Sequence, residues 1–423
     1  MNKRHILLTV MCALTLTQTL RAEEEINDQN TPLHLLAPDY KMPYGALKSE
    51  DVKATLDRVF SWCKEGTFRL DSYEWGITYQ ALMRASNVTG EKQYRDYVDK
   101  SLKKVISNPL RRLTALDDCG TITTAMMKFE GKKGGKYDKY INGYNDFIFN
   151  KQYKLPNGMF ARTRPQFNTI WLDDIYMGIP AMAEYAIWAG DSKKIDEAVT
   201  MFFHFVERMW RPEKNIYRHG YVEGLAQQPT YSWGRANGWA LLTNTELLDM
   251  VPADHPMRGA LLEQYRKHLK GLCDLQSSEG LWHQLLDRND SYLETSCTAI
   301  YCYCIARGIN NGWIEGITYG GVAQLAWHAL STKVDEKGRV LGTCVGTGMA
   351  FDPAFYYYRP VSSAAAHGYG PMLWAAAEMI ELLKHWYPRT NDSGLHYYST
   401  EQTNPAPLFF LTPDGKGESI NEW

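Results

Sequence analysis

Apolar residues recur along most of the chain at the three- and four-residue spacing of one helix face. Val52, Leu56, Val59 and Cys63 show this spacing first, and later segments repeat it. The pattern predicts twelve helices joined mostly by short loops, and therefore an all-α fold. We expect them at residues 52–63, 75–85, 94–105, 118–129, 136–150, 174–189, 193–210, 234–250, 256–275, 292–309, 316–332 and 370–386.

Strand patterns are few and short. Residues 158–162, 216–219 and 281–284 are expected to form small hairpins between helices. No Gly/Ser linker or charge block divides the chain, so residues 48–423 are expected to form one domain. Paired helices can stack as an open solenoid or close into a ring of two layers. Aromatic and polar motifs directly precede several predicted helices. This favours a closed ring in which the loops that carry these motifs gather at one end, around a central cleft.

The N-terminus has the pattern of a secretion signal. Basic residues 3–5 precede an apolar run at 6–16 that is too short to span a bilayer, and small residues near Ala22 offer a cleavage point. We expect a signal peptide at 1–22, an irregular arm at 23–47, and a periplasmic or secreted protein. Lipid attachment at Cys12 is the alternative.

Composition narrows the class of partner. The 423 residues are 44% hydrophobic and 22% charged with a net charge of −2, which is typical of soluble globular proteins and disfavours nucleic acid or an anionic membrane as partner. The 13 Trp and 27 Tyr suit either a core or sugar-stacking surfaces. Cys297, Cys302 and Cys304 lie in an apolar segment without metal-site spacing, so we expect buried thiols and no metal.

The long connection at residues 333–369 contains a glycine-rich stretch, Gly342 to Gly348. It lacks the Lys-Ser/Thr ending and the strand-then-helix setting of a phosphate-binding loop. The pattern favours a surface loop that shapes a cleft.

Two carboxylate pairs precede predicted helices. Asp173 and Asp174 follow Trp171, and Asp117 and Asp118 stand before the helix expected at 118–129. In each pair a carboxylate can cap the helix or do acid–base chemistry. An indole beside Asp173 would remove water from the carboxyl, raise its pKa and suit a general acid.

One histidine and one arginine have settings that suggest a binding site. His219 ends a Tyr-rich extended segment before Gly220, where it is either structural or part of a cleft wall. Arg235 lies between Trp233 and Trp239, so it is either a stacked structural cation or the anchor of a uronate carboxylate.

Taken in order, these motifs resemble a known family. The chain is similar to the unsaturated uronyl hydrolases of glycoside hydrolase family 105, the rhamnogalacturonyl hydrolases, and to their relatives in family 88. The motifs that carry the resemblance are Trp171-x-Asp173, Tyr217-x-His219-Gly220, Trp233-x-Arg235-x-Asn237-Gly238-Trp239, Gly280-Leu281-Trp282-His283-Gln284, Glu294-Thr295-Ser296 and His367-Gly368-Tyr369-Gly370.

The resemblance implies an (α/α)6 toroid that acts without a cofactor on a 4,5-unsaturated uronic acid at the end of an oligosaccharide. It implies that Asp173 is the general acid and base, and that Asp117 or its neighbour Asp118 is the second acid. It also implies that substrate-binding side chains line the unsaturated ring. These are His219 and Arg235 as polar contacts, with Trp233, Trp239 and Trp171 as aromatic ones.

Several alternatives remain open at this level. One is a conventional inverting glycosidase or a sugar epimerase on the same toroid, and another is a helical carbohydrate-binding protein without catalysis. For the sugar after the uronide, rhamnose is the family default, with ulvan, arabinogalactan and glycosaminoglycan fragments as other choices. The residues do not predict an oligomeric state.

Overall fold

The computed structural model describes residues 47–110, 112–391, 394–399, 408–411 and 417–420. The expected signal peptide, with Cys12 in it, lies outside the described residues, as does all of the expected arm except Leu47.

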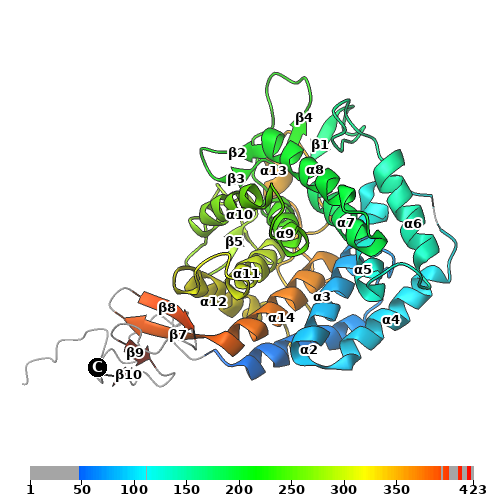
Figure 1. The fold of residues 1–423 in the computed structure, drawn as a ribbon. Helices are drawn as coiled ribbons and strands as arrows, with labels where there is room; N and C mark the ends of the chain where they lie inside the picture. The colour runs from blue at the N-terminus through cyan, green and yellow to red at the C-terminus, as the bar shows by residue number, and fades with distance from the viewer. Residues whose placement is uncertain (1–46, 111, 392–393, 400–407, 412–416, 421–423) are drawn as a thin grey trace, which may run out of the picture.

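Twelve helices of nine or more residues occur in this described part, as the hydrophobic spacing predicts. Six form an inner ring in which each helix packs against the next and the last contacts the first. The other six surround that ring, each packed on one inner helix (Figure 1). The inner helices are α3 (Tyr73–Thr89), α5 (Gly120–Glu130), α7 (Asp173–Ala189), α9 (Gly234–Met250), α11 (Thr295–Asn310) and α14 (Tyr369–His385). The outer helices are α2 (Ser49–Glu65), α4 (Lys92–Ile106), α6 (Asp138–Asp146), α8 (Lys193–Met209), α10 (Arg258–Cys273) and α12 (Gly316–Thr332). This closed arrangement confirms the expected (α/α)6 toroid.

Side-chain burial separates the two layers. In the inner helix α9 every residue from Gly234 to Leu248 is buried, because neighbours cover it on all sides. The outer helix α8 buries Ile195, Val199 and Phe202 at a spacing of three or four and exposes most of its other face. An amphipathic pattern therefore marks the outer layer, and a helix that is buried all round, polar residues included, marks the ring.

Glycines let the inner helices approach each other closely near their N-termini. A Cβ atom on Gly120 of α5 would lie 1.5 Å from the carbonyl oxygen of Met177 in α7. A Cβ on Gly76 of α3 would lie 2.7 Å from the backbone nitrogen of Ile122 in α5. Any larger residue would push these helices apart and widen the ring at this end.

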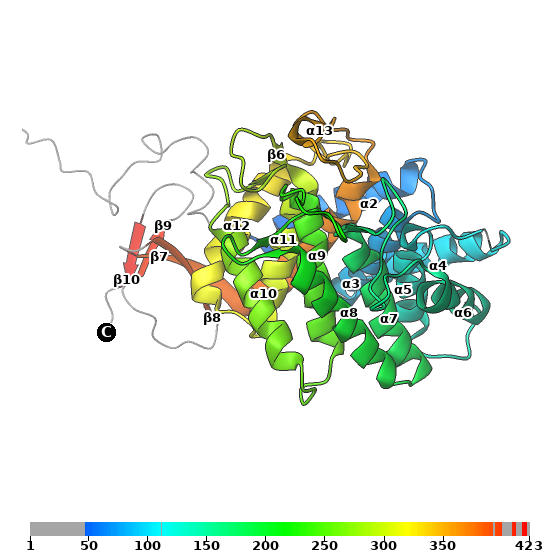
Figure 2. The same cartoon turned by 90° about the horizontal axis from the view of Figure 1, so that it is seen from above.

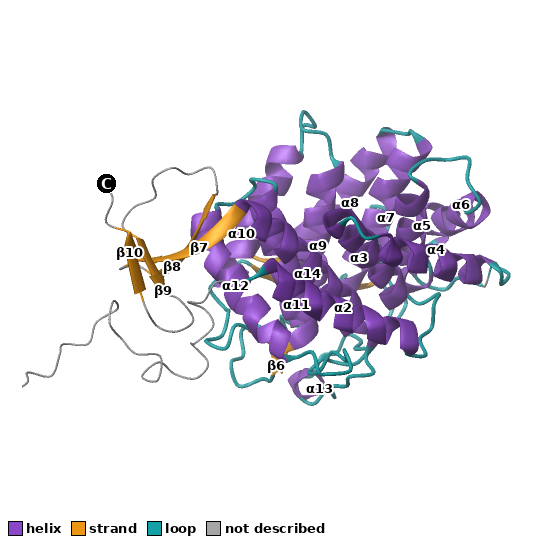
Figure 3. Ribbon diagram, turned by 90° about the horizontal axis from the view of Figure 1, so that it is seen from below, coloured by secondary structure: helices purple, strands orange, loops and turns teal. Residues whose placement is uncertain are grey.

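All six inner helices point the same way because one outer helix returns the chain between each successive pair. Their N-termini and the loops before them form one end of the ring, here called the mouth. Figures 2 and 3 show loops, β6 and the short helix α13 (Pro353–Tyr357) gathered there. Three two-stranded sheets stiffen the loops: β1 (Thr169–Trp171) with β4 (Gly220–Val222), β2 (Trp210–Arg211) with β3 (Ile216–Tyr217), and β5 (Trp282–His283) with β6 (Leu293–Glu294).

The structure departs from the predicted elements in three places. Residues 158–162 form isolated bridges, Lys154 with Phe160 and Arg162 with Thr169, rather than a strand. The helix expected at 136–150 changes at Phe147 into a π-helical turn, η4 (Phe147–Lys151). The helix expected from residue 292 begins at Thr295, because the preceding residues pair as β6.

A small sheet that the sequence pattern did not predict follows α14. Its four strands are β7 (Trp386–Asn391), β8 (Gly394–Ser399), β9 (Leu408–Leu411) and β10 (Gly417–Ile420), in the order β10-β9-β7-β8. Strand β8 contacts α12, and the sheet lies beyond the helical layers at the lower left of Figure 1. The expected helical domain to residue 423 therefore ends in a β extension.

Cysteines and membrane-spanning potential complete the description. The seven cysteines from Cys63 to Cys344 are free thiols, and Cys297, Cys302 and Cys304 are buried in α11 as expected. Within the described ranges no cluster of three or more His, Cys, Asp or Glu side chains is arranged to hold a metal ion. None of the helices described is both long and apolar enough to cross a membrane.

Candidate active site

A chain of three polar side chains lies at the mouth. Asp173, the first residue of α7, places its carboxylate Oδ2 2.7 Å from Nε2 of His219. The other ring nitrogen of His219, Nδ1, lies 2.7 Å from the hydroxyl of Tyr356 in α13. The backbone N–H of Ala350 donates to that hydroxyl at 3.2 Å, so the Tyr356 proton is free to point at His219. With that donation, His219 carries its proton on Nε2 and donates it to Asp173.

A second cluster lies beside the first and is built on Arg162. Its guanidinium binds both carboxylate oxygens of Asp174, at 2.8 and 2.7 Å, and reaches Asp117 at 3.0 Å. It also packs over the indole of Trp171, 4.2 Å from the ring centroid. Asp174 is 1% exposed and both of its carboxylate oxygens bind Arg162, so its role is to hold this arginine. Asp173, whose side chain is 13% exposed, is the residue of this pair that remains available for chemistry.

Nearby charges and burial shift the pKa values of the two acids at the mouth, Asp173 and Asp117, in opposite directions. Burial opposes ionisation of Asp173, but His219, Arg162 and Arg235 outweigh it, so the pKa of this carboxyl is lowered. Burial and the nearby charges of Asp174 and Asp173 raise the pKa of Asp117 to about 6, although Arg162 acts in the opposite direction. The expectation that Trp171 would raise the pKa of Asp173 is therefore wrong. Asp117 is therefore the mouth carboxyl whose pKa is raised, and in the free protein it loses its proton as pH rises through about 6.

The structure also shows which of the paired aspartates cap a helix or a turn. The residue that precedes α7 is Leu172, and no side chain caps that helix. Asp118 accepts hydrogen bonds from the backbone of Thr114 and Ala115, at 2.8 and 3.2 Å, and so closes the turn before α5. Of this pair, Asp117 is the one that meets Arg162 at the mouth, and Asp118 has a structural role.

Arg235 is placed differently from the expected carboxylate anchor. It is 1% exposed, and its two terminal nitrogens donate to the carbonyl oxygens of Cys344 and Val345 at 2.7 and 2.8 Å. Its guanidinium also lies over the Trp233 ring, 4.5 Å from the centroid. These contacts show that Arg235 holds the start of the loop of residues 344–348, and its role as an anchor for a uronate stays a prediction.

The expected aromatic walls are core residues. Trp233 and Trp239 are each 1% exposed, so neither offers a ring face to a sugar. The indole nitrogen of Trp233 donates to Gln284 at 3.0 Å, and Trp239 stacks on Tyr176 with ring centroids 5.3 Å apart. Trp171, at 8% exposure, is the partly accessible indole among the three.

Sequence reasoning assigned no role to three further residues of the mouth. Tyr73, at the start of α3, lies in the electrostatic field of Asp117, Asp173 and Arg235 and hydrogen-bonds to Nε2 of His367. Burial and the charge of Arg235 lower the pKa of His367, so this ring is neutral. Arg162 and Tyr356 likewise received no role. Arg162 ends the segment that was expected to form a short strand, and Tyr356 lies in the long connection of residues 333–369, so neither stood in a motif that suggested chemistry.

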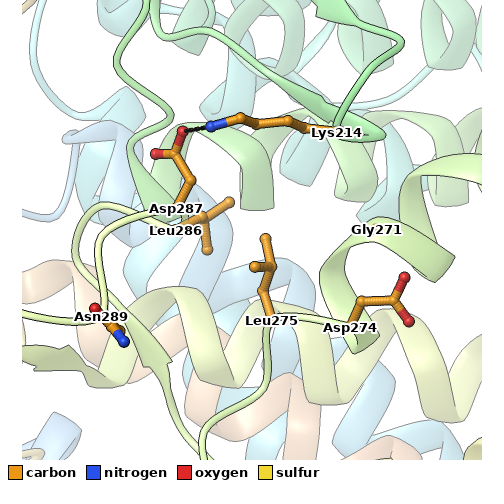
Figure 4. Close-up of a pocket in the computed structure, with 7 residues that line it drawn as sticks. All are labelled: Lys214, Gly271, Asp274, Leu275, Leu286, Asp287 and Asn289. Atoms are coloured by element: carbon orange, nitrogen blue, oxygen red, sulfur yellow. Dashed lines mark hydrogen bonds and ion pairs between the residues drawn. The ribbon is translucent and has the colours of Figure 1, made fainter.

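Two further cavities lie away from the acid site. One of about 460 Å³ lies at the surface, where Lys214 pairs with Asp287 at 2.5 Å across from Asp274 (Figure 4). Another, of about 290 Å³, lies at the opposite end of the ring and is lined by residues of all six inner helices, among them Gln80, Lys128 and Glu184.

Comparison with known proteins supports the same architecture. An unsaturated rhamnogalacturonyl hydrolase, YesR, from Bacillus subtilis is 25% identical over 356 residues, which cover 80% of this chain and 97% of that protein. An unsaturated 3S-rhamnoglycuronyl hydrolase from Alteromonas is 27% identical over 221 residues, 51% of this chain and 52% of that one. A crystal structure of a possible family 105 member from Salmonella enterica aligns with a TM-score of 0.72 at 20% identity, covering 83% of this chain and 97% of that one.

The ring of six inner and six outer helices is the (α/α)6 architecture, and the solved family 105 structure aligns with most of it. The profile of Glycosyl Hydrolase Family 88 matches residues 48–383, which is most of the chain. The protein belongs to this family, which includes the family 105 relatives expected from the motifs.

Proposed function

We propose that the protein removes a 4,5-unsaturated uronic acid from the non-reducing end of oligosaccharides that polysaccharide lyases release, with rhamnogalacturonan-type fragments as the favoured substrate. The observation that carries the proposal is the pair of acids at the mouth. Asp173 is hydrogen-bonded to His219, and the pKa of Asp117 is raised to about 6. The similarity to a rhamnogalacturonyl hydrolase over most of both chains supports the choice of substrate.

The proposed reaction is hydration of the C4=C5 double bond. Asp173 donates a proton to C4, and positive charge develops at C5, where the ring oxygen shares it. A water molecule adds to C5 and returns a proton to the Asp173 carboxylate. The resulting hemiketal opens, and the sugar partner leaves from C1. One proton is given and one recovered, so the enzyme ends in its starting state, and no second carboxylate has to attack the sugar.

The substrate itself helps to load Asp173 with a proton. In the free protein His219, Arg162 and Arg235 keep the pKa of Asp173 low. A uronate that enters the mouth adds a negative charge beside this carboxyl and raises its pKa, since like charges oppose ionisation. Asp117, whose pKa is already about 6, is the nearby carboxyl that carries the proton before binding.

One assay tests the proposal. The protein is mixed with lyase-generated pectic, ulvan or glycosaminoglycan fragments, and the ultraviolet absorbance of the conjugated double bond is followed. We expect the absorbance to disappear with the wild type and to persist with Asp173→Asn. Asp274→Asn is the control, because Asp274 pairs with Lys270 on the exposed face of α10 and touches nothing at the mouth. Cleavage of saturated oligosaccharides with no loss of absorbance would favour a conventional glycosidase instead.

We also propose export to the periplasm or the medium, on the basis of residues 1–22. Expression in a bacterial host followed by fractionation tests this. The chain should lose its first residues and leave the cytoplasm, and charged substitutions within the apolar run at 6–16 should retain it there. Equal retention of both versions would contradict the proposal.

A further inference from the structure

A loop at the mouth has its carbonyl groups fixed by two arginines. Arg235 binds the carbonyls of Cys344 and Val345 from inside the ring. Arg359 binds the carbonyl of Gly346 from the rim, and its Nε donates to the Thr347 hydroxyl at 3.2 Å. Glu294 holds the start of the same loop, because its carboxylate accepts the backbone N–H of Cys344 at 2.8 Å. Three charged side chains thus fix a glycine-rich segment that has no regular secondary structure.

The N–H groups of the same loop are left without protein partners. Among the residues that the structure describes, no acceptor receives the backbone N–H of Gly346, Thr347 or Gly348. In a trans peptide the N–H points opposite to the carbonyl that precedes it. Because Arg359 draws the Gly346 carbonyl toward the rim, the N–H of Thr347 is turned the other way, toward the interior of the mouth.

The neighbours of the loop place these groups at the acid site. A Cβ atom on Gly346 would lie 3.8 Å from the ring of His367, and one on Gly348 would lie 3.3 Å from the indole of Trp171. The loop therefore runs between His367 and Trp171. The residue two positions after Trp171 is Asp173. His367 is 6% exposed, and its Nδ1 has no hydrogen-bond partner, so it adds an unpaired polar atom beside the loop.

The two buried arginines of the site direct most of their N–H groups at protein acceptors. Arg162 binds two aspartates and, in the described part of the chain, its Nη1 is buried without a partner, and Arg235 binds two carbonyls and the Ser296 hydroxyl. The unpaired N–H groups of the loop belong to residues that are less buried than these arginines, so a substrate carboxylate can reach them. Consecutive main-chain N–H groups in a glycine-rich loop are a common cradle for an anion, and the N-termini of the six inner helices add a favourable field there.

We infer that Thr347 and Gly348 bind the uronate carboxylate through their main-chain N–H groups, and that Arg359 is the positioning residue that turns this part of the loop toward the mouth. This inference rests on the proposed function and assigns the anion selectivity of the same site. Arg359 acts through the loop and does not itself touch the sugar.

The experiment compares an unsaturated uronide disaccharide with its uronate methyl ester, which carries no charge. The ratio of kcat/KM for acid over ester is measured for the wild type, Arg359→Ala, Arg359→Lys and Arg164→Ala. Arg164 is the competing candidate, because it is exposed and its guanidinium lies 4.8 Å from the centroid of Trp171. Arg339→Ala is the matched control in the same long connection, where Arg339 pairs only with Asp335.

We expect Arg359→Ala to lower the acid-to-ester ratio by about tenfold through KM for the acid, the size of one charge-assisted hydrogen bond. Ester turnover should be largely kept, and Arg359→Lys should recover part of the ratio. An equal fall for acid and ester in Arg359→Ala would make Arg359 merely structural, and loss of the ratio in Arg164→Ala alone would give the anchor to Arg164. Either result overturns the inference. If the wild type turns over acid and ester at equal rates, only this inference is contradicted. If it turns over neither substrate, the proposed function is contradicted as well.

Discussion

The two ends of the inner ring use charged side chains in opposite ways. At the C-terminal end, Arg84 binds Glu378 at 2.8 Å, Arg307 binds Asp249 at 3.0 Å, and Lys128 binds Glu246, so these charges meet complements on other inner helices. At the mouth, Asp173 is hydrogen-bonded to a histidine and Asp117 shares its arginine with Asp174. Among the described residues no acceptor receives the N–H groups of residues 346–348. One end holds the helices together, and the other end leaves polar groups available for a substrate.

This contrast teaches that burial alone does not identify a functional charge. Glu378 is fully buried and strongly paired, yet nothing suggests that it acts on a sugar. Asp173 is nearly as enclosed, but its hydrogen-bond partner is His219, which is itself held by Tyr356. What distinguishes the mouth is that its acid is hydrogen-bonded to a histidine that a tyrosine orients, rather than to a lysine or an arginine.

The largest expected effect is on catalysis at the mouth. Asp173→Asn should lower kcat by about 1,000-fold, as expected when a general acid and base is removed, and should leave thermal unfolding nearly unchanged. Steady-state kinetics on an unsaturated disaccharide and a melting curve measure the two quantities. Activity within a few-fold of wild type would show that Asp173 does not carry the proton.

The next effect concerns stability at the opposite end. Glu378→Ala leaves Arg84, Arg307 and Asn310 without their shared acceptor and should lower the free energy of unfolding by about 3 kcal/mol, with kcat kept. The matched control, Glu381→Ala, breaks an exposed pair with Lys384 on the same helix and should cost less than about 1 kcal/mol. Urea unfolding measures both. A loss of kcat in Glu378→Ala without a loss of stability would break the division between the ends.

The two ends should also differ in what depends on pH, activity at the mouth and stability at the opposite end, since each end has one acid with a pKa raised to about 6. At the mouth this acid is Asp117, so kcat/KM should fall as pH rises through about 6, when the free enzyme loses that proton. Asp117→Asn should remove this limb from any residual activity. A flat profile between pH 5 and 8 would exclude a proton held on Asp117 from the reaction.

At the opposite end the acid is Asp249, whose pKa burial raises although Arg307 acts against it. A carboxyl with a folded pKa above its unfolded value stabilises the fold fully below the unfolded value, and the effect is lost as pH rises through the folded one. The stability of the wild type relative to Asp249→Asn should therefore fall by about 2 kcal/mol between pH 4 and 7. Urea unfolding at the two pH values measures it, and a rise instead would contradict the assigned shift.

The smallest effect tests the end of the polar chain. Tyr356→Phe removes the hydroxyl that faces Nδ1 of His219, so the ring loses the group that fixes its tautomer. We expect kcat to fall by about tenfold with KM little changed, as for loss of one orienting hydrogen bond. Tyr303→Phe at the opposite end, where the hydroxyl lies 3.4 Å from Glu246, should leave kcat unchanged. Equal effects of both variants would show a general packing role.

The hydrophobic spacing determined the twelve helices, because each outer helix needs one apolar stripe to pack on the ring and each inner helix needs apolar residues on the faces that meet its neighbours. The helix expected at 234–250 coincides with α9, and the ordered motifs identified the family and selected Asp173. The C-terminal sheet was not predicted, since its strands lack the long, regular alternation that stands out from loops.

Only the tertiary structure decided what the polar residues near Asp173 do. Arg235 was expected to hold the substrate, but its partners lie about 110 residues away in a loop that the sequence could not place. Arg162 forms an isolated bridge and Tyr356 lies in the short helix α13, and closure of the ring brings both to the acid site. Periodicity reports which face of a helix is buried, whereas the partner of a side chain depends on which distant loop reaches it.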